Sequence, residues 1–152
     1  MMAASRVLGI DLGERHIGLA ISDELGLVAQ GLPTLNRLGL EGDLATLGEI
    51  IGKYEVQEVV VGCPRNMDGT LGGEAEKASA FAQELERAFE VRTVLWDERL
   101  TTRAAERLLI EAGMRRRKRR QVVDQVAAVL ILQGFLDVRC QMLDVGGLEE
   151  EG

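Results

Sequence analysis

The chain has 152 residues, of which 46% are hydrophobic, and its formal net charge is −7. That length fits one domain, with an apolar core large enough to be stable without disulfide bonds. The two cysteines, Cys63 and Cys140, are too few and too far apart in sequence for a disulfide framework or a zinc site. No stretch approaches the ~18 apolar residues of a membrane span, and the first residues do not resemble a signal peptide. We therefore expect a soluble, cytoplasmic protein that does not bind membranes.

Apolar runs separated by turn residues predict an alternation of strands and helices. In chain order, we expect strands at Val7–Ile10, Ile17–Ser22 and Leu27–Leu32, a helix at Glu41–Tyr54, a strand at Val56–Gly62, a helix at Glu74–Phe89, a strand at Val91–Trp96, and helices at Thr101–Ala112 and from Gln121 to about Val138. Pro33 is expected to end the third strand. This order predicts an α/β fold, a mixed five-stranded sheet flanked by helices on both faces. We assign residues 1–140 to one domain and residues 141–152 to an acidic, frayed tail.

Three acidic residues fall where the expected elements meet one edge of the sheet. Asp11 ends the first strand, Glu98 follows the fifth, and Asp124 is almost the only charge on the last helix, where Ala127 and Ala128 allow a close approach to the sheet. Ligands of such sheets bind beyond the carboxyl ends of the parallel strands. Carboxylates this close repel one another unless cations neutralise them, and oxygen ligands without Cys or His favour Mg²⁺ or Mn²⁺. We predict a metal site that could hydrolyse phosphodiesters.

Each of these acids also has an ordinary interpretation, which the sequence leaves open. Asp11 could use its side chain locally in a turn. Glu98 could be a first-turn helix acid or a partner of Arg99, and Asp97 competes with it for the metal site. Asp124 could cap the last helix.

Four sequence blocks carry a resemblance to a known family. "GIDLG" with "IGLAISD", "VVGCPRNMDG", "DERLTT" and "VDQVAAVLIL" after a basic run resemble the YqgF family of bacterial RNase H-like proteins, which is related to the Holliday junction resolvase RuvC. The resemblance extends from Val7 to about Leu132. It implies an RNase H-like fold, a divalent metal, and a nuclease role in maturing the 5′ end of pre-16S ribosomal RNA.

The resemblance also implies roles for single residues. The first-strand acid of the family falls on Asp11, the acid of the "DERLTT" block on Glu98, and the helical acid on Asp124. This chain departs from the family at His16, where members commonly have Arg, and at Cys63, where an aliphatic residue is more common. The phosphate contact expected from an arginine is therefore in doubt at His16.

A run of basic residues directly precedes the last predicted helix. It consists of Arg115, Arg116, Arg117, Lys118, Arg119 and Arg120. On pattern alone it is equally a solvated loop or a nucleic-acid contact. Its place beside Asp124 favours binding of phosphates near the metal site, since these charges would offset the acidity of the rest of the chain. Arg65, Asn66 and Arg99 are further candidates for contacts with nucleic acid, and the low aromatic content favours structured or duplex substrates.

Three other functions compete with the pre-rRNA nuclease. "GIDLG" also opens the actin-like and sugar kinase ATPases, but those need a second domain for which 152 residues leave no room. Holliday junction resolution would require a dimer, and the sequence is compatible with a monomer or a weak homodimer. A protein that binds nucleic acid or a transcription complex without catalysis would not need the three acids.

Overall fold

The computed structural model describes residues 6–63, 72–97 and 125–139. Their elements are β1 (Arg6–Leu12), β2 (His16–Ser22), β3 (Ala29–Asn36), α1 (Leu40–Tyr54), β4 (Val56–Cys63), α2 (Gly73–Phe89) and β5 (Arg92–Asp97), followed by a helix at 125–139. One five-stranded sheet has the order β3-β2-β1-β4-β5. β1, β2 and β3 are antiparallel neighbours, whereas β1, β4 and β5 run parallel. The predicted mixed sheet is confirmed.

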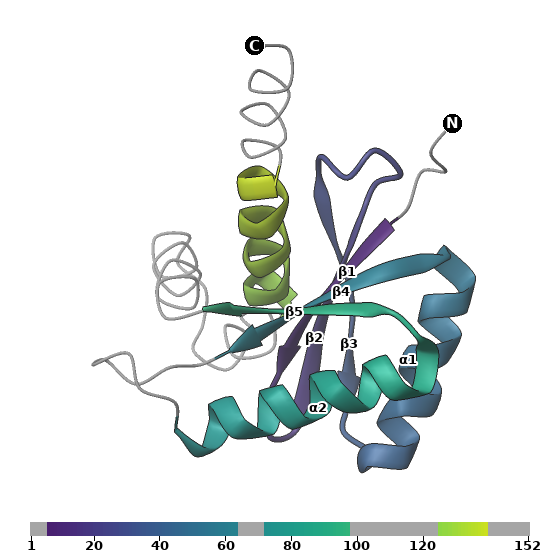
Figure 1. The fold of residues 1–152 in the computed structure, drawn as a ribbon, viewed down its shortest axis with the longest axis vertical. Helices are drawn as coiled ribbons and strands as arrows, with labels where there is room; N and C mark the ends of the chain where they lie inside the picture. Colours follow the sequence, from purple (N-terminus) through teal and green to yellow (C-terminus); the bar gives the residue numbers. More distant parts are fainter. Residues whose placement is uncertain (1–5, 64–71, 98–124, 140–152) are drawn as a thin grey trace.

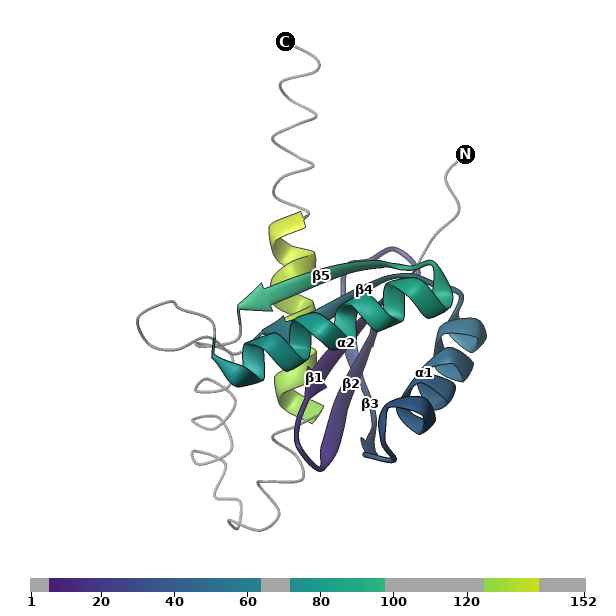
Figure 2. The same ribbon diagram turned by 60° about the horizontal axis from the view of Figure 1, so that its bottom comes forward.

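Helices cover both faces of this sheet, as predicted. α1 and α2 lie on one face, and the yellow-green helix 125–139 lies on the other (Figures 1 and 2). Each face has its own apolar cluster: one includes Leu8, Ile10, Leu47 and Leu85, and the other Val7, Val60, Ile131 and Leu132. Among the described residues, no helix has the length and apolarity needed to cross a bilayer.

The alternation of side chains along β1 explains how the two clusters are divided. Leu8 and Ile10 belong to the cluster under α1 and α2, whereas Val7 belongs to the cluster under helix 125–139. Gly9 faces the same way as Val7. A Cβ added at Gly9 would lie 2.8 Å from Cβ of Leu132, so this glycine lets the helix rest directly on the central strand.

The third strand differs from the prediction. We expected it to end before Pro33, but β3 continues to Asn36. β3 is an edge strand, where a missing N–H is tolerated. The pairing with β2 also shifts here: Leu32 and Leu35 flank two β3 residues that lie opposite Gly18 alone. Pro33 therefore sits in a bulge, which the local sequence rule does not foresee.

Other boundaries are also longer or later than predicted. β1 does not end at Ile10 but reaches Leu12, because its pairing with β2 continues to Leu12 and Ile17. Its pairing with β4 stops at Ile10 and Val61. The predicted helix at residues 101–112, the start of the last helix at residues 121–124 and the predicted tail at residues 141–152 lie outside the described residues.

Candidate active site

Asp11 lies near the carboxyl end of the central strand, inside β1 rather than after it. It pairs with Gly18 of the antiparallel neighbour β2. By the alternation of β1 it faces helix 125–139, like Val7 and Gly9, and its side chain is half-buried. A carboxylate thus points from the middle strand toward the face on which the last helix packs.

Glycines flank Asp11 on both neighbouring strands. On β2, Gly18 is its direct partner. On β4, the residue after the last paired position, Val61, is Gly62, which stands at the level of Asp11. The sheet surface beside this carboxylate therefore carries no side chain on either neighbour, so a hydrated cation would meet no side chain from these two positions. Mg²⁺ typically keeps several waters and binds through few carboxylates.

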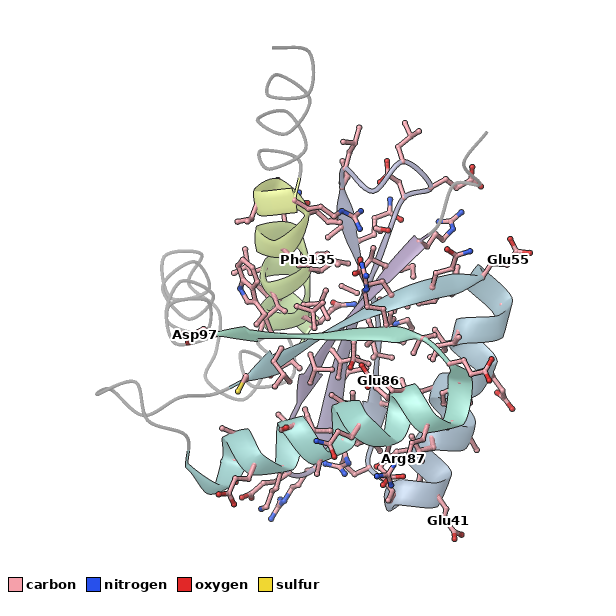
Figure 3. The ribbon with its side chains drawn as sticks, viewed as in Figure 1. Glu41, Glu55, Glu86, Arg87, Asp97 and Phe135 are labelled. Carbon is pink, nitrogen blue, oxygen red and sulfur yellow. The ribbon has the colours of Figure 1, made fainter. Side chains whose placement is uncertain are left out.

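The end of β5 shows which face of the sheet Asp97 takes, one of the two acids that compete for the metal site. Trp96 faces helix 125–139: a Cβ added at Gly134 would lie 3.1 Å from its ring, and the rings of Trp96 and Phe135 meet edge to face at 6.3 Å. Figure 3 labels Phe135 on this helix and Asp97 at the tip of β5. Because side chains alternate along a strand, Asp97 points to the opposite face, alongside its partner Cys63. Asp97 and Asp11 therefore lie on different faces of the sheet.

Helix 125–139 runs antiparallel to β1, so its first residues lie near the edge that carries Asp11. At that end, Nε2 of Gln125 donates a 2.9 Å hydrogen bond to the carbonyl oxygen of Leu32. At the other end, Arg139 binds Glu58, near the start of β4, at 2.9 Å. Between them, Gln133 accepts from the N–H of Ala29 and donates to the carbonyl oxygen of Leu27, both at 2.9 Å. Polar contacts along its whole length thus fix the helix on the sheet.

The structure describes only part of the predicted site. Asp11 is placed as expected, at the carboxyl edge of the parallel strands. Its predicted partners and the predicted nucleic-acid contacts lie outside the described residues: Glu98, Asp124, Arg65, Asn66, Arg99 and Arg115–Arg120. The described part of the chain contains no group of three or more potential metal ligands. His16, at the start of β2, lies on the face of Asp11 by alternation with Gly18.

A buried ion pair that the sequence analysis missed holds the turn after Asp11. The guanidinium of Arg37 donates from Nε to Asp43 at 2.7 Å and from Nη1 to the carbonyl oxygen of Gly13 at 2.8 Å. Asp43 also accepts from the N–H of Leu38 at 2.9 Å. This Arg37–Asp43 pair joins the β1–β2 turn to the start of α1. One signal was available, because Asp43 precedes the buried Leu47 by four residues and so lies on the apolar stripe of α1.

At the same edge, but on the face of α1 and α2, the surface is hollowed into a groove of about 650 Å³. Its lining comes from the end of β1 with the following turn, the loop before α1 with the first residue of that helix, and α2 between Glu74 and Glu84. We call it the acidic groove, after the carboxylates Glu14, Glu74 and Glu84 in its lining. The Asp11 face and the acidic groove thus lie on opposite sides of the same sheet edge.

Asp23, in the β2–β3 loop at the far end of the sheet, has a lowered pKa. The N–H groups of Val28 and Leu27 donate to its carboxylate and stabilise the charged form. This acid fixes the conformation of its own loop and lies away from Asp11.

Comparison with known proteins places the chain in a family. The family model described as "RuvX: Holliday junction resolvase" matches residues 5–138. The chain belongs to the RuvX family. Among RuvX relatives, a Moorella thermoacetica protein is 54% identical over 132 residues, covering 87% of this chain and 94% of its own. A Bacillus subtilis protein is 50% identical over 134 residues, covering 87% and 97%. Both are named "Putative pre-16S rRNA nuclease".

Solved structures agree with the RuvX assignment at the level of the fold. Thermus thermophilus RuvC, solved with a Holliday junction substrate, has a TM-score of 0.54 at 16% identity and covers 90% of this chain and 96% of its own. The yeast mitochondrial Holliday junction resolvase Ydc2 has a TM-score of 0.58 at 14% identity and covers 99% and 85%. The RNase H-like fold implied by the sequence blocks is therefore confirmed.

Proposed function

We propose that this chain is a divalent-metal-dependent nuclease that hydrolyses phosphodiester bonds in nucleic acid and acts, in the cytoplasm, in processing the 5′ end of pre-16S rRNA. One observation carries the proposal: Asp11 stands at the carboxyl end of the central strand, flanked by Gly18 and Gly62, on the face of helix 125–139. The RNase H-like fold and the nuclease names of relatives at about half identity support it.

We further propose that Glu98 and Asp124 complete the site with Asp11. Glu98 is two residues after Trp96, so if the alternation of β5 continues, it takes the face of Asp11, whereas Asp97 does not. Asp124 directly precedes Gln125, the first described residue of the helix that lies over this face.

The donor chemistry of this proposed set fits a hard cation. All three side chains offer carboxylate oxygens, which suit Mg²⁺ or Mn²⁺, and the buried thiol of Cys63 belongs to the other face. A bound divalent cation would supply an activated water and neutralise charge that develops on the scissile phosphate. Asp11 would offer its carboxylate to this cation from the central strand, where its backbone is paired with β2 and the preceding residue, Ile10, is paired with β4.

For substrate binding, we propose Arg65, Asn66, Arg99 and the basic run Arg115–Arg120. Acidic side chains outnumber basic ones in the described part of the chain. Phosphates would be repelled there, so the attraction has to come from a local basic cluster. His16, on the face of Asp11, offers a weaker phosphate contact than an arginine would.

Holliday junction resolution is the second candidate, and the description of the matching family favours it. Cutting two opposed strands at once needs two sites, hence a dimer. We propose that the chain is a monomer or a weak homodimer. RNA processing is compatible with either form, whereas junction resolution is compatible only with the homodimer.

A cleavage assay tests both functions. Pre-16S RNA with its 5′ extension and a four-way DNA junction are compared at matched salt with Mg²⁺ or Mn²⁺. We expect cleavage of the RNA, and loss of most cleavage in Asp11→Asn, Glu98→Gln and Asp124→Asn, with Asp97→Asn as the matched control that retains it. Cleavage of the junction alone would replace the first function by the second. Loss in Asp97→Asn with activity in Glu98→Gln would overturn the ligand assignment.

A further inference from the structure

The acidic groove combines an apolar floor with a carboxylate rim. Leu12, Leu40 and Phe81 provide apolar lining. On the rim, Glu74 and Glu84 come from α2, and Glu14 from the β1–β2 turn adds a third carboxylate. A volume of about 650 Å³ is enough for several side chains. An apolar centre with a charged rim is the usual anatomy of a protein interface.

The two cations in the lining of the groove, Arg37 and Lys77, offset only part of this acidity. The guanidinium of Arg37 is engaged by Asp43 and by the carbonyl oxygen of Gly13. Lys77 lies 3.5 Å from Glu74, one turn away on the same helix. The groove therefore presents net negative charge to anything that enters it, and phosphate-rich ligands are disfavoured.

The rim glutamates of α2 are nevertheless available to a partner. Glu74 pairs only with exposed Lys77, and Glu84 with exposed Arg87 at 3.6 Å, among the described residues. Exposed pairs of this kind within one helix are weak, so a cation arriving from outside competes with them easily. Replacing either ion pair by one with a partner's cation would leave the backbone of α2 unchanged.

Exposed leucines extend the apolar floor beyond the groove. Leu40 is 46% exposed, and its neighbour Leu38 is 70% exposed. Two large apolar side chains this exposed beside a groove favour an occupant longer than a small molecule. Glu41 follows Leu40 in the first turn of α1 and adds a further carboxylate at the end of the helix that borders the groove (Figure 3).

We propose that the acidic groove binds a cationic, amphipathic segment of a partner protein, with arginine or lysine side chains on the rim carboxylates and an aliphatic or aromatic side chain over Leu12 and Leu40. The net negative charge of the groove disfavours nucleic acid, and the apolar floor favours an occupant with apolar side chains over a purely polar cation. This docking site is independent of the metal chemistry. It lies on the α1–α2 face, whereas Asp11 faces helix 125–139, so a partner and a nucleic-acid substrate can be bound at the same time.

Three labelled peptides test the chemistry by fluorescence anisotropy on the full chain. One alternates arginine and leucine, one glutamate and leucine, and one arginine and serine. We expect binding of the first, none of the second, and clearly weaker binding of the third. Amide shifts in NMR spectra of the complex should centre on Gly13, Gly39 and Lys77. Equal binding of all three peptides, or shifts centred elsewhere, would overturn the proposal.

Matched double variants separate the groove from general acidity. Glu74→Gln/Glu84→Gln should weaken binding of the arginine–leucine peptide roughly tenfold, since two ion pairs with a partner are lost. Glu49→Gln/Glu76→Gln changes the net charge equally on exposed helix positions outside the groove and should leave the affinity within about twofold. If both double variants weaken binding equally, the peptide is attracted by the overall negative charge of the protein, and the proposal that it binds in the acidic groove is refuted.

Two further outcomes would replace the proposed occupant. If a short RNA shifts the groove amides, the surface binds nucleic acid; if those amides shift with protein concentration alone, the occupant is a second copy of this chain. Nuclease activity is measured in parallel and should be unchanged in Glu74→Gln/Glu84→Gln. The docking proposal and the nuclease proposal can therefore fail separately.

Discussion

The Arg37–Asp43 pair offers the sharpest test of how the Asp11 turn is held. The side chain of Asp43 is 2% exposed and that of Arg37 26%. Arg37→Met keeps most of the apolar stem but leaves a buried carboxylate with one remaining donor, the N–H of Leu38. Removing one partner of a buried ion pair costs about 3–5 kcal/mol.

The partial exposure of Arg37 decides where in that range the loss of stability in Arg37→Met should fall. Water can reach the space left by the guanidinium, so we expect a loss of about 3 kcal/mol, the lower end of the range. For a chain of this size, that corresponds to a fall in Tm of roughly 6–12 °C. Asp43→Asn, which still accepts from Leu38, should cost less, about 1.5–2 kcal/mol.

The assay is urea unfolding followed by circular dichroism in the absence of divalent cations. The double variant Arg37→Met/Asp43→Asn buries no charge, so it should lose about 2 kcal/mol less than the sum of the single variants. Glu24→Gln is the matched control, because its pair with Arg6 is exposed, at 3.4 Å, and should contribute less than about 1 kcal/mol. A loss below about 1 kcal/mol in Arg37→Met, or additive single variants, would refute the reasoning.

Two further predictions concern the packing of the last helix and the far loop. Gly9→Ala should cost about 1–3 kcal/mol in urea unfolding, because its Cβ would lie 3.2 Å from the carbonyl oxygen of Ala128 on helix 125–139, whereas Gly52→Ala, with no atom within 4 Å, should stabilise by about 0.5–1 kcal/mol. The pKa of Asp23 is lowered from 3.8 by the N–H groups of the loop, so its stabilising contribution is complete above that value and disappears as the pH falls through the lower, folded-state pKa. An NMR titration of the Asp23 carboxyl carbon should show this shift, and a midpoint at or above 3.8 would contradict it.

The sheet could be predicted because its signals are local. Valines in succession from Val59 to Val61 indicate a strand buried on both faces, and such a strand needs helices above and below it. Asp11 stood out for the same reason, as a charge within an apolar run. Position along the chain was therefore enough to place both the central strands and the first acid.

The remaining features depend on partners that are distant in sequence. Pro33 signals the end of a strand, but at the sheet edge a bulge opposite Gly18 accommodates it. Arg37 looks like a loop residue until the fold brings the carbonyl oxygen of Gly13, 24 positions earlier in the chain, beside its guanidinium. The acidic groove is formed by three segments whose proximity follows from strand order, so no single segment indicates it.

The pleat of the sheet bears on the choice between Asp97 and Glu98, which composition leaves open. Asp97 and Glu98 are adjacent and chemically alike, but the contact of Trp96 with helix 125–139 fixes the phase of β5. Successive residues of a strand face opposite ways, so Asp97 belongs to the α2 face, and we propose that Glu98 takes the face of Asp11. The same alternation separates the acidic groove from Asp11 across a single sheet. On our two proposals, this acidic chain presents its carboxylate site to nucleic acid on one face, and its other face remains free for a cationic protein segment.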